Sequence, residues 1–554
     1  MAINSRFNSD NSVRLFNKPA LQFSIVFLLL LTAFAVRLYH INRPPLDFSP
    51  IRQYQNAHII RGLYFEKNES ISESRKNIAK LNMERMGFLL EPRIIENAAV
   101  FGYRIAGEEH FWIPRALSAV FWVIGGFFLY LIARAMFSPG IALFSIIFYL
   151  FLPYGILASR SIQPDPLMVM MMLFSIYGIL KYDENPSRIN LISAAIVAAI
   201  ATLIKPYCFF MIFGAFFSLT VLRTGFWKAI FQRNTLVFAF IIIAPTVGYY
   251  VYGLLYNVGF IGEHAKSSFL PQLILYPFFW RGWLSMIGNV IGYIAFLLAI
   301  IGLFKIKPGR PKALLLGLWI GYFLFGLSAT FQIHTHSYYT MPFIPIAALS
   351  LGPLAAMVMN RYAPLLSLRS KLFVLTLIFS VLIVGLSLNM RKLPLRKVLS
   401  DHKGELKTMA TFVGINPEFS KFLSDDFDEN VRIAKEIGEL VDHSSNTIFL
   451  TPDFGRVLAY HGEFSGLPWP TSESLYERGL RGTKVPNIKE DFTPENIKIL
   501  YQGKFIKYSP DFFIITAFDE LDRQTDLNNF LKSNFPVFVQ SDDYLIFDLR
   551  KMSK

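Results

Sequence analysis

The sequence predicts a polytopic α-helical membrane domain followed by a small α/β domain. Of the 554 residues, 53% are hydrophobic and 16% aromatic, and the mean hydropathy is +0.41, far more apolar than a water-soluble protein of this size. Long apolar runs fill the first part of the chain, and after about residue 400 the sequence becomes charged, with short apolar runs. We therefore expect a membrane domain at residues 1–390, which includes a long loop at 40–115, and a second domain at 391–554.

The apolar runs predict about eleven membrane-spanning helices, each near the roughly 20 residues that cross a bilayer. They fall near residues 21–39, 116–136, 140–157, 165–181, 189–204, 207–222, 236–256, 285–304, 313–330, 341–359 and 371–389. Arg6, Arg14 and Lys18 precede the first run as in a signal peptide, but no small-residue cleavage site follows it. We expect this run to remain as an uncleaved helix.

The formal charge of +15 is distributed as in a membrane protein rather than a nucleic-acid-binding protein. Lys and Arg gather in alternate loops, for example at Arg223 and at Lys307, which is the positive-inside pattern. This predicts a multi-pass protein of the cell (inner) membrane with a cytoplasmic N-terminus, an extracytoplasmic loop 40–115 and an extracytoplasmic C-terminal domain. Cys208 is the single cysteine, so an intramolecular disulfide is excluded.

Secondary structure is also expected outside the membrane. In the first loop, Ile51–Tyr64 and Ile94–Ile105 have helical apolar spacing, and we expect both to lie in the membrane interface, with a polar and mobile segment, Glu66–Arg85, between them. In the tail, helices and strands alternate as in a small α/β domain. The expected tail elements are helices at Glu429–Val441 and Leu521–Asn534 and strands at Thr447–Thr451, Phe512–Thr516, Val537–Gln540 and Tyr544–Leu549.

Two carboxylates stand where apolar segments would leave the membrane, a costly place for a charge. Asp47 follows Pro44 and Pro45, which hold the backbone extended. It is either a solvated loop residue or a general base for an acceptor hydroxyl or amine. Asp165, between Pro164 and Pro166, is either a helix N-cap or a site residue that positions the acceptor or shares a divalent cation with Asp47.

Basic residues predicted on the same side of the membrane can bind an anion. Lys205 interrupts a hydrophobic stretch before Pro206, where it either snorkels to the interface or holds a phosphate as a point charge. Arg52 can add a bidentate contact to that phosphate. Arg61, and Arg104 or Arg115, complete the basic set.

A third group of candidate residues lies at His334-Thr-His336-Ser-Tyr338-Tyr339. The two histidines have no third ligand nearby in the sequence, which disfavours zinc. Tyr338 and Tyr339 suit a membrane-interface belt, and together with His336 they also suit hydrogen bonding to phosphate oxygens.

The order of these features resembles the GT-C glycosyltransferases of the protein-mannosyltransferase and aminoarabinose-transferase type (the glycosyltransferase family 39 type). The resemblance rests on Asp47 after the first helix, on Phe101–Gly107 leading to Pro114-Arg115, on Ile162-Gln-Pro-Asp165, on Lys205-Pro206 and on His336–Pro342, and it covers nearly the whole chain. One departure is that the family often has Asp-Glu after the first helix, whereas Phe48 follows Asp47 here. Glu91 is a candidate for the second carboxylate.

The resemblance implies a GT-C-like fold and an inverting transfer of a sugar from a polyprenyl-phosphate donor to an acceptor lipid, glycan or protein. Asp47 would be the base, and Arg52, Asp165, Lys205, His336, Tyr338 and Tyr339 would bind substrate. No cofactor is required by this mechanism, although Asp47 and Asp165 leave room for a divalent cation. The bilayer is the expected partner, and nucleic acid is not.

Two other functions compete with this one. A ligase or polymerase of lipid-linked glycans would also present basic residues outside the membrane, but the long first loop and large tail suit it less. An ion-coupled transporter would place its carboxylates near the bilayer midplane and would often show internal repeats, and neither is visible here.

Overall fold

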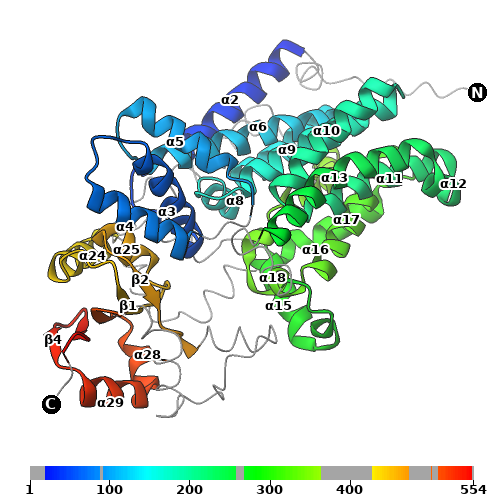
Figure 1. Cartoon of the computed structure of the whole chain (residues 1–554). Helices are drawn as coiled ribbons and strands as arrows, with labels where there is room; N and C mark the ends of the chain where they lie inside the picture. The colour runs from blue at the N-terminus through cyan, green and yellow to red at the C-terminus, as the bar shows by residue number, and fades with distance from the viewer. Residues whose placement is uncertain are drawn as a thin grey trace, which may run out of the picture.

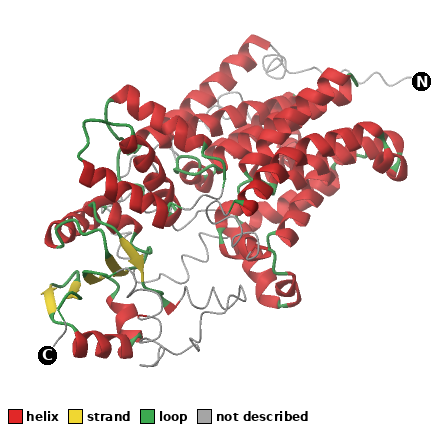
Figure 2. Ribbon diagram, in the orientation of Figure 1, coloured by secondary structure: helices red, strands yellow, loops and turns green. Residues whose placement is uncertain are grey.

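The computed structural model describes residues 19–87, 91–256, 268–362, 427–472, 501 and 509–551. Helices make up the described chain as far as residue 362, and the strands that are described all lie after residue 446 (Figure 2). This confirms the predicted class, a polytopic helical membrane protein with a C-terminal α/β region. The domain boundary predicted at residue 390 lies outside the described residues.

All but one of the predicted spans fall on apolar helices; the span at 371–389 lies outside the described residues. Within the described part of the chain, five helices are long and apolar enough to cross a bilayer: α2 (Pro19–Arg37), α6 (Trp112–Met136), α9 (Asp165–Glu184), α13 (Arg233–Leu255) and α17 (Arg310–Ser328). Shorter apolar helices are α7 (Pro139–Phe151), α10 (Arg188–Ile204), α11 (Cys208–Thr224) and α19 (Phe343–Tyr362). Short connecting helices are α8 (Pro153–Ala158), α12 (Phe226–Phe231), η1 (Pro271–Leu275), α18 (Thr330–Thr335) and η2 (Ser337–Thr340).

The span predicted at 285–304 falls on apolar helices but is sharply bent. Two helices, α15 (Pro277–Ile291) and α16 (Tyr293–Lys305), meet there at an angle of 94°. Gly292 joins them with φ +82°, a backbone conformation that glycine adopts without the strain a side chain would cause. The apolar composition of the segment gives no sign of the bend.

Close helix packing holds the membrane region together, as at the contact of α11 with α17, which lie side by side in Figure 1. A Cβ atom on Gly214 would lie only 2.3 Å from the carbonyl oxygen of Gly317. Small residues at such a crossing let two backbones approach closely, which favours association of helices inside a bilayer.

The first loop contains three helices, α3 (Pro50–Glu66), α4 (Glu73–Met86) and α5 (Ile94–Ala106). α5 is amphipathic, with Phe101 and Ile105 exposed on one face and Tyr103 buried on the other, and its place at the membrane interface stays a prediction. The segment predicted to be polar and mobile instead includes α4, whose first turn is capped by Ser72.

α3 does not lie on the membrane surface, so that prediction is wrong. Nearly all of its residues are buried, including Gln53, Tyr54 and Ile60. The cover comes from α4, from α5 and from α25 (Arg456–Gly462) of the C-terminal domain. α3 carries two of the candidate residues, Arg52 and Arg61, so this cover places both of them inside the protein.

The described residues of the C-terminal domain form a five-stranded sheet between two pairs of helices. Its strand order is β2-β1-β3-β5-β4, with β1 parallel to β2 and β3 and with β5 antiparallel to β3 and β4. The strands are β1 (Thr447–Leu450), β2 (Gly466–Pro468), β3 (Phe512–Ile515), β4 (Val537–Gln540) and β5 (Leu545–Asp548). Helices α24 (Asp428–Leu440) and α25 cover one face, and α28 (Phe518–Arg523) and α29 (Thr525–Asn534) cover the other.

The predicted tail elements are largely confirmed. The strands at Thr447–Thr451 and Phe512–Thr516 and the closing strand pair are present, while the helix predicted at Leu521–Asn534 is divided into α28 and α29 at Gln524. α25 packs against α3 and α4, and Met86 of α4 enters the apolar core of the domain (Figure 1). The first loop and the C-terminal domain therefore form one continuous structure.

Candidate active site

Asp47 lies in the segment between α2 and α3, and it is 5% exposed. Its Oδ2 atom accepts a hydrogen bond from Arg115 Nη2 and lies 3.6 Å from Arg160 Nε. Its Oδ1 atom has no hydrogen-bond partner among the described residues. Because buried polar atoms are normally paired, Oδ1 marks a position where a ligand or water would bind.

The same two arginines fix the backbone around Asp47. Arg115, in the first turn of α6, donates to the carbonyls of Arg43 (2.9 Å) and Arg160 (3.3 Å). Arg160 donates to the carbonyls of Tyr39 and His40. The end of α2, the start of α6 and the loop before α9 are thus held together, so the position of the Asp47 carboxylate is well determined.

A second cluster forms at the N-terminus of α9. Lys205 Nζ lies 3.1 Å from Asp165 Oδ2, and the Tyr207 hydroxyl donates to Asp165 Oδ1 at 3.0 Å. Lys205 is there because α10 ends at this residue, directly before Pro206. Both charged side chains are buried, which favours neither of the simple roles of helix cap or snorkelling lysine.

Glu91 extends this cluster to α3. Arg52 Nη2 donates to both Glu91 oxygens at 2.6 and 2.8 Å, and Lys205 Nζ lies 3.5 Å from Glu91 Oε1. Arg52, Glu91, Lys205 and Asp165 therefore form one chain of ion pairs, which we call the ion-pair chain. Burial alone would lower the pKa of Arg52, but the adjacent Glu91 carboxylate raises it above its ordinary value.

The predicted aromatic group lies against the same lysine. Lys205 Nζ is 5.5 Å from the ring centroid of Tyr338 and 5.2 Å from that of Tyr339, within the range of a cation–π interaction. The His336 ring lies 5.4 Å from the Tyr338 ring, and His336 Nδ1 bonds to the Thr335 hydroxyl. All the substrate-binding residues named from the sequence thus lie in one region: Arg52, Asp165, Lys205, His336, Tyr338 and Tyr339.

Gln53 connects this region with the Asp47 loop. Its Oε1 atom accepts from the Ile162 backbone N–H at 3.0 Å, in the loop that leads to Asp165. Its Nε2 atom donates to the carbonyls of Phe48 and Pro45, which flank Asp47. Phe48 itself packs edge-on against the Tyr154 ring, so the residue after Asp47 belongs to the core rather than to the polar site. Asp47 and the ion-pair chain are therefore built on a shared frame.

The C-terminal domain adds a basic residue that the sequence did not single out. Arg456 Nη1 donates to the Ile51 carbonyl at 3.1 Å, immediately before Arg52. Burial and the neighbouring Arg52 guanidinium lower the pKa of Arg456 to about 10. No local pattern could have identified it, because its role depends on a contact between segments about 400 residues apart.

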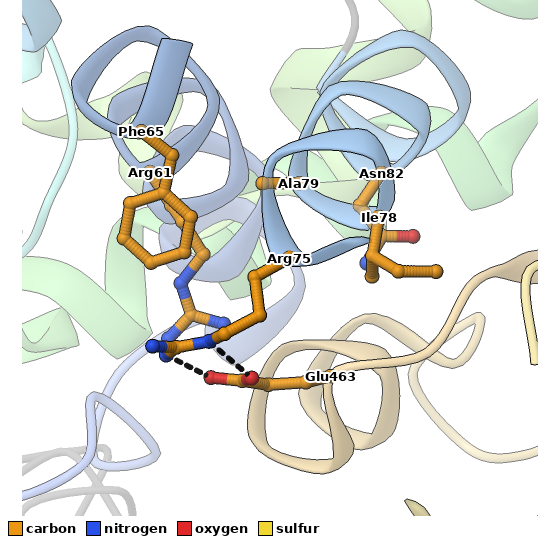
Figure 3. Close-up of a pocket in the computed structure, with 7 residues that line it drawn as sticks. All are labelled: Arg61, Phe65, Arg75, Ile78, Ala79, Asn82 and Glu463. Carbon is orange, nitrogen blue, oxygen red and sulfur yellow. Dashed lines mark hydrogen bonds and ion pairs between the residues drawn. The ribbon is translucent and has the colours of Figure 1, made fainter. Parts of the chain in front are cut away.

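Arg61 lies apart from the ion-pair chain, in the contact between α3 and the C-terminal domain. It donates to Glu109 at 2.6 and 2.9 Å, and its guanidinium carbon lies 3.4 Å from the centre of the Tyr460 ring. Figure 3 shows the small pocket beside it, where Arg75 pairs with Glu463 at 2.6 and 2.7 Å. Phe65, Ile78, Ala79 and Asn82 complete the lining. Arg104, the other basic residue named with Arg115, is exposed at the end of α5.

The described residues contain no group of three or more His, Cys, Asp or Glu side chains arranged for a metal ion. Asp47 faces two arginines, and Asp165 faces a lysine. His334 bonds through Nδ1 to the carbonyl of Thr330 rather than joining His336 as a ligand pair.

The structure has the GT-C fold, the fold of a class of polytopic glycosyltransferases. Its parts are the helical bundle of the membrane region, the helical first loop and the α/β domain packed over that loop. The model of the dolichyl-phosphate-mannose-protein mannosyltransferase family matches residues 92–249. No curated protein matches the chain in sequence.

Solved structures give the same fold. ArnT from Cupriavidus metallidurans bound to undecaprenyl phosphate is 16% identical, with a TM-score of 0.50, and the match covers 95% of this chain and 97% of that one. The apo oligosaccharyltransferase of Archaeoglobus fulgidus is 11% identical, with a TM-score of 0.51 and coverage of 94% and 73%. The same enzyme tethered to an acceptor peptide is 11% identical, with a TM-score of 0.50 and coverage of 90% and 69%. At these identities the likeness is one of fold.

Proposed function

We propose that this protein is an inverting glycosyltransferase that moves a sugar from a polyprenyl-phosphate donor to an acceptor. The observation that carries the proposal is a buried group of cations (Arg52, Lys205 and Arg456) on the same frame as the Asp47 carboxylate, one oxygen of which has no partner among the described residues. Cations of this kind suit the phosphate of a lipid-linked donor. The solved ArnT relative, bound to undecaprenyl phosphate, supports the same class of ligand.

In the proposed reaction the acceptor nucleophile attacks the anomeric carbon as the bond between that carbon and the phosphate oxygen breaks. The electron pair of the broken bond leaves with the polyprenyl phosphate. Lys205 and Arg52 stabilise the negative charge that develops there, which is the main electrostatic contribution. Tyr338 and His336 add hydrogen bonds to the phosphate oxygens. A single displacement inverts the configuration at the anomeric carbon.

Asp47 is proposed as the base, taking the proton of the acceptor hydroxyl or amine on Oδ1. This oxygen is the one without a partner among the described residues, while Oδ2 is held by Arg115. The base would therefore be positioned through one oxygen and would accept the proton through the other. Asp165 is proposed to orient Lys205.

The proposed orientation places this site outside the cytoplasm. It rests on the positive-inside distribution of Lys and Arg, which puts the N-terminus in the cytoplasm and the first loop and C-terminal domain on the opposite side of the cell membrane. Such an arrangement suits a donor whose sugar is displayed in the outer leaflet and an acceptor that belongs to the cell envelope.

The test is sugar transfer by the purified protein in detergent, with a panel of polyprenyl-phosphate sugars and a membrane extract as the acceptor source. Labelled product together with released polyprenyl phosphate would establish the activity and identify the donor. Turnover only with intact lipid-linked oligosaccharide would assign a glycan ligase instead. Absence of turnover with every donor, from folded protein, would overturn the enzyme assignment and favour a transporter.

A further inference from the structure

Glu91 lies between Arg52 and Lys205, the two basic residues that are proposed to contact the donor phosphate. Its two oxygens accept from Arg52 Nη2, and one of them also faces Lys205 Nζ at 3.5 Å. It comes from the first loop just before α5, whereas its partners come from α3 and from the end of α10. A carboxylate in that position occupies part of the anion-binding capacity of both cations.

The charges of the site are nearly balanced because of Glu91. In the ion-pair chain, Arg52 and Lys205 are matched by Glu91 and Asp165, and Arg456 adds one further positive charge from the C-terminal domain. All five side chains are buried or nearly so, and charges that are shielded from water act on one another strongly. Counted over these five side chains, three positive and two negative charges leave a net charge of +1, which suits an anion with one negative charge.

We propose that Glu91 is a specificity-determining residue, which sets the charge of the site to select a monophosphate-linked donor over a diphosphate-linked one. This inference rests on the proposed function. The phosphodiester of a polyprenyl-phosphate sugar carries one negative charge, whereas a diphosphate link carries two. The polyprenyl phosphate that is released is a monoester with close to two charges, so Glu91 also favours its departure after transfer.

The test is Glu91→Gln, which keeps the shape of the side chain and removes its charge. We expect the variant to bind polyprenyl phosphate about tenfold more tightly than the wild type, because one repulsive charge is lost. Its kcat/KM for diphosphate-linked relative to monophosphate-linked donors should rise, and its kcat with the monophosphate donor should fall as product release slows. A purely structural role for Glu91 would instead weaken binding.

The matched control is Glu109→Gln. Glu109 accepts two hydrogen bonds from Arg61, which lies on α3 like Arg52, and this pair resembles that of Glu91 with Arg52. Glu109 lies outside the ion-pair chain. Its variant should bind polyprenyl phosphate as the wild type does. Unchanged or weaker binding by folded Glu91→Gln would overturn the inference while leaving the proposed function in place. Failure of the wild type to bind any polyprenyl phosphate would overturn both.

Discussion

Lys205 and Asp165 form a buried ion pair, with 3.1 Å between Nζ and Oδ2. Each residue is the nearest oppositely charged group to the other. Removing one partner of such a pair leaves an uncompensated charge away from water, which costs far more than the pair itself contributes. The pair therefore contributes both to the stability of the site and to its proposed phosphate binding. Substitution of one or both partners can distinguish these two contributions.

Lys205→Met should lower the free energy of unfolding by about 3–5 kcal/mol, because the Asp165 carboxylate is left unpaired. The double variant Lys205→Met/Asp165→Asn should recover most of this loss. Neither variant should bind polyprenyl phosphate. Thermal unfolding in detergent and a lipid-phosphate binding assay measure the two effects. A double variant that is no more stable than the single one, or that keeps binding, would contradict the assignment.

Asp47→Asn should reduce transfer by about 10²–10⁴-fold, the usual contribution of a general base, with binding of polyprenyl phosphate nearly unchanged. Asp183→Asn provides the control: Asp183, near the other end of α9, is also paired with two arginines, Arg223 and Arg310, at 3.1 and 2.6 Å. Its variant should retain activity. Equal loss in both variants would mean that any broken carboxylate–arginine pair impairs the enzyme, and retained turnover by Asp47→Asn would remove Asp47 as the base.

The docking of the C-terminal domain on α3 should weaken in acid. Burial lowers the pKa of His58 from about 6.5 to about 3, and its Nε2 atom bonds to the Arg456 carbonyl at 2.9 Å. The undocked histidine takes up a proton as the pH falls below 6.5, whereas the docked one stays neutral. Docking therefore has its full strength above pH 6.5 and loses about 2 kcal/mol from this residue by pH 5.

Hydrogen exchange of α3 and α25, compared at pH 7.5 and 5.0, would detect this change. His58→Gln should show a smaller difference between the two conditions, because an amide N–H can still donate to the Arg456 carbonyl without titrating. Burial also lowers the pKa of His461, to about 3, and its ring bonds to the Tyr54 hydroxyl at 2.6 Å. Part of the response should therefore persist until both histidines are replaced. Exchange that is independent of pH in the wild type would refute the prediction.

Two arginines at the pocket of Figure 3 should differ in their effect on stability. Arg75→Ala removes an ion pair with Glu463 that is largely open to solvent, and we expect a loss below about 1 kcal/mol. Arg61→Ala removes a buried guanidinium that contacts Glu109 and stacks on Tyr460, so about 2 kcal/mol or more should be lost. Denaturation of the two variants side by side measures the difference, and equal losses would be inconsistent with this account.

Transfer should not depend on a divalent cation. The reason lies in the ion pairs of the two candidate carboxylates: Asp47 is held by Arg115, and Asp165 by Lys205, so each already has a positive partner. Treatment with a chelator should leave the rate unchanged. Loss of activity that is restored by Mg²⁺ or Mn²⁺ would show instead that a metal ion takes part.

The sequence predicted the helices well because span length and composition are local properties. α9 and α10 begin and end within a few residues of their predicted bounds, and the strands of the tail follow from short apolar runs such as Phe512–Ile515. The errors have two causes, tertiary contact at α3 and the local backbone conformation of Gly292. α3 has the spacing of an interfacial helix and yet is covered by α25, and Gly292 turns a continuous apolar run into two helices.

The sequence predicts which residues belong to the candidate site, but it does not predict which of them contact one another. Arg52, Lys205 and Tyr338 were predicted because each can bind a phosphate from the same side of the membrane, and the structure brings them together. The pairing of Arg160 with Asp47 rather than with Asp165 was not foreseen, because both carboxylates are plausible partners in sequence. Arg456 had no signal at all, since its place is set by the packing of a distant domain.

The contact of α25 with α3 has a consequence for how the chain is made. Residues near position 58 leave the ribosome about 400 residues before Arg456, so the polar helix α3, although α4 and α5 follow it directly, must wait through the synthesis of most of the protein before α25 completes its cover. Contacts between such distant segments form slowly, and an uncovered helix is open to proteases and to misassembly in the meantime. A chain that stops before residue 456 would thus keep its membrane helices but would not complete the first loop.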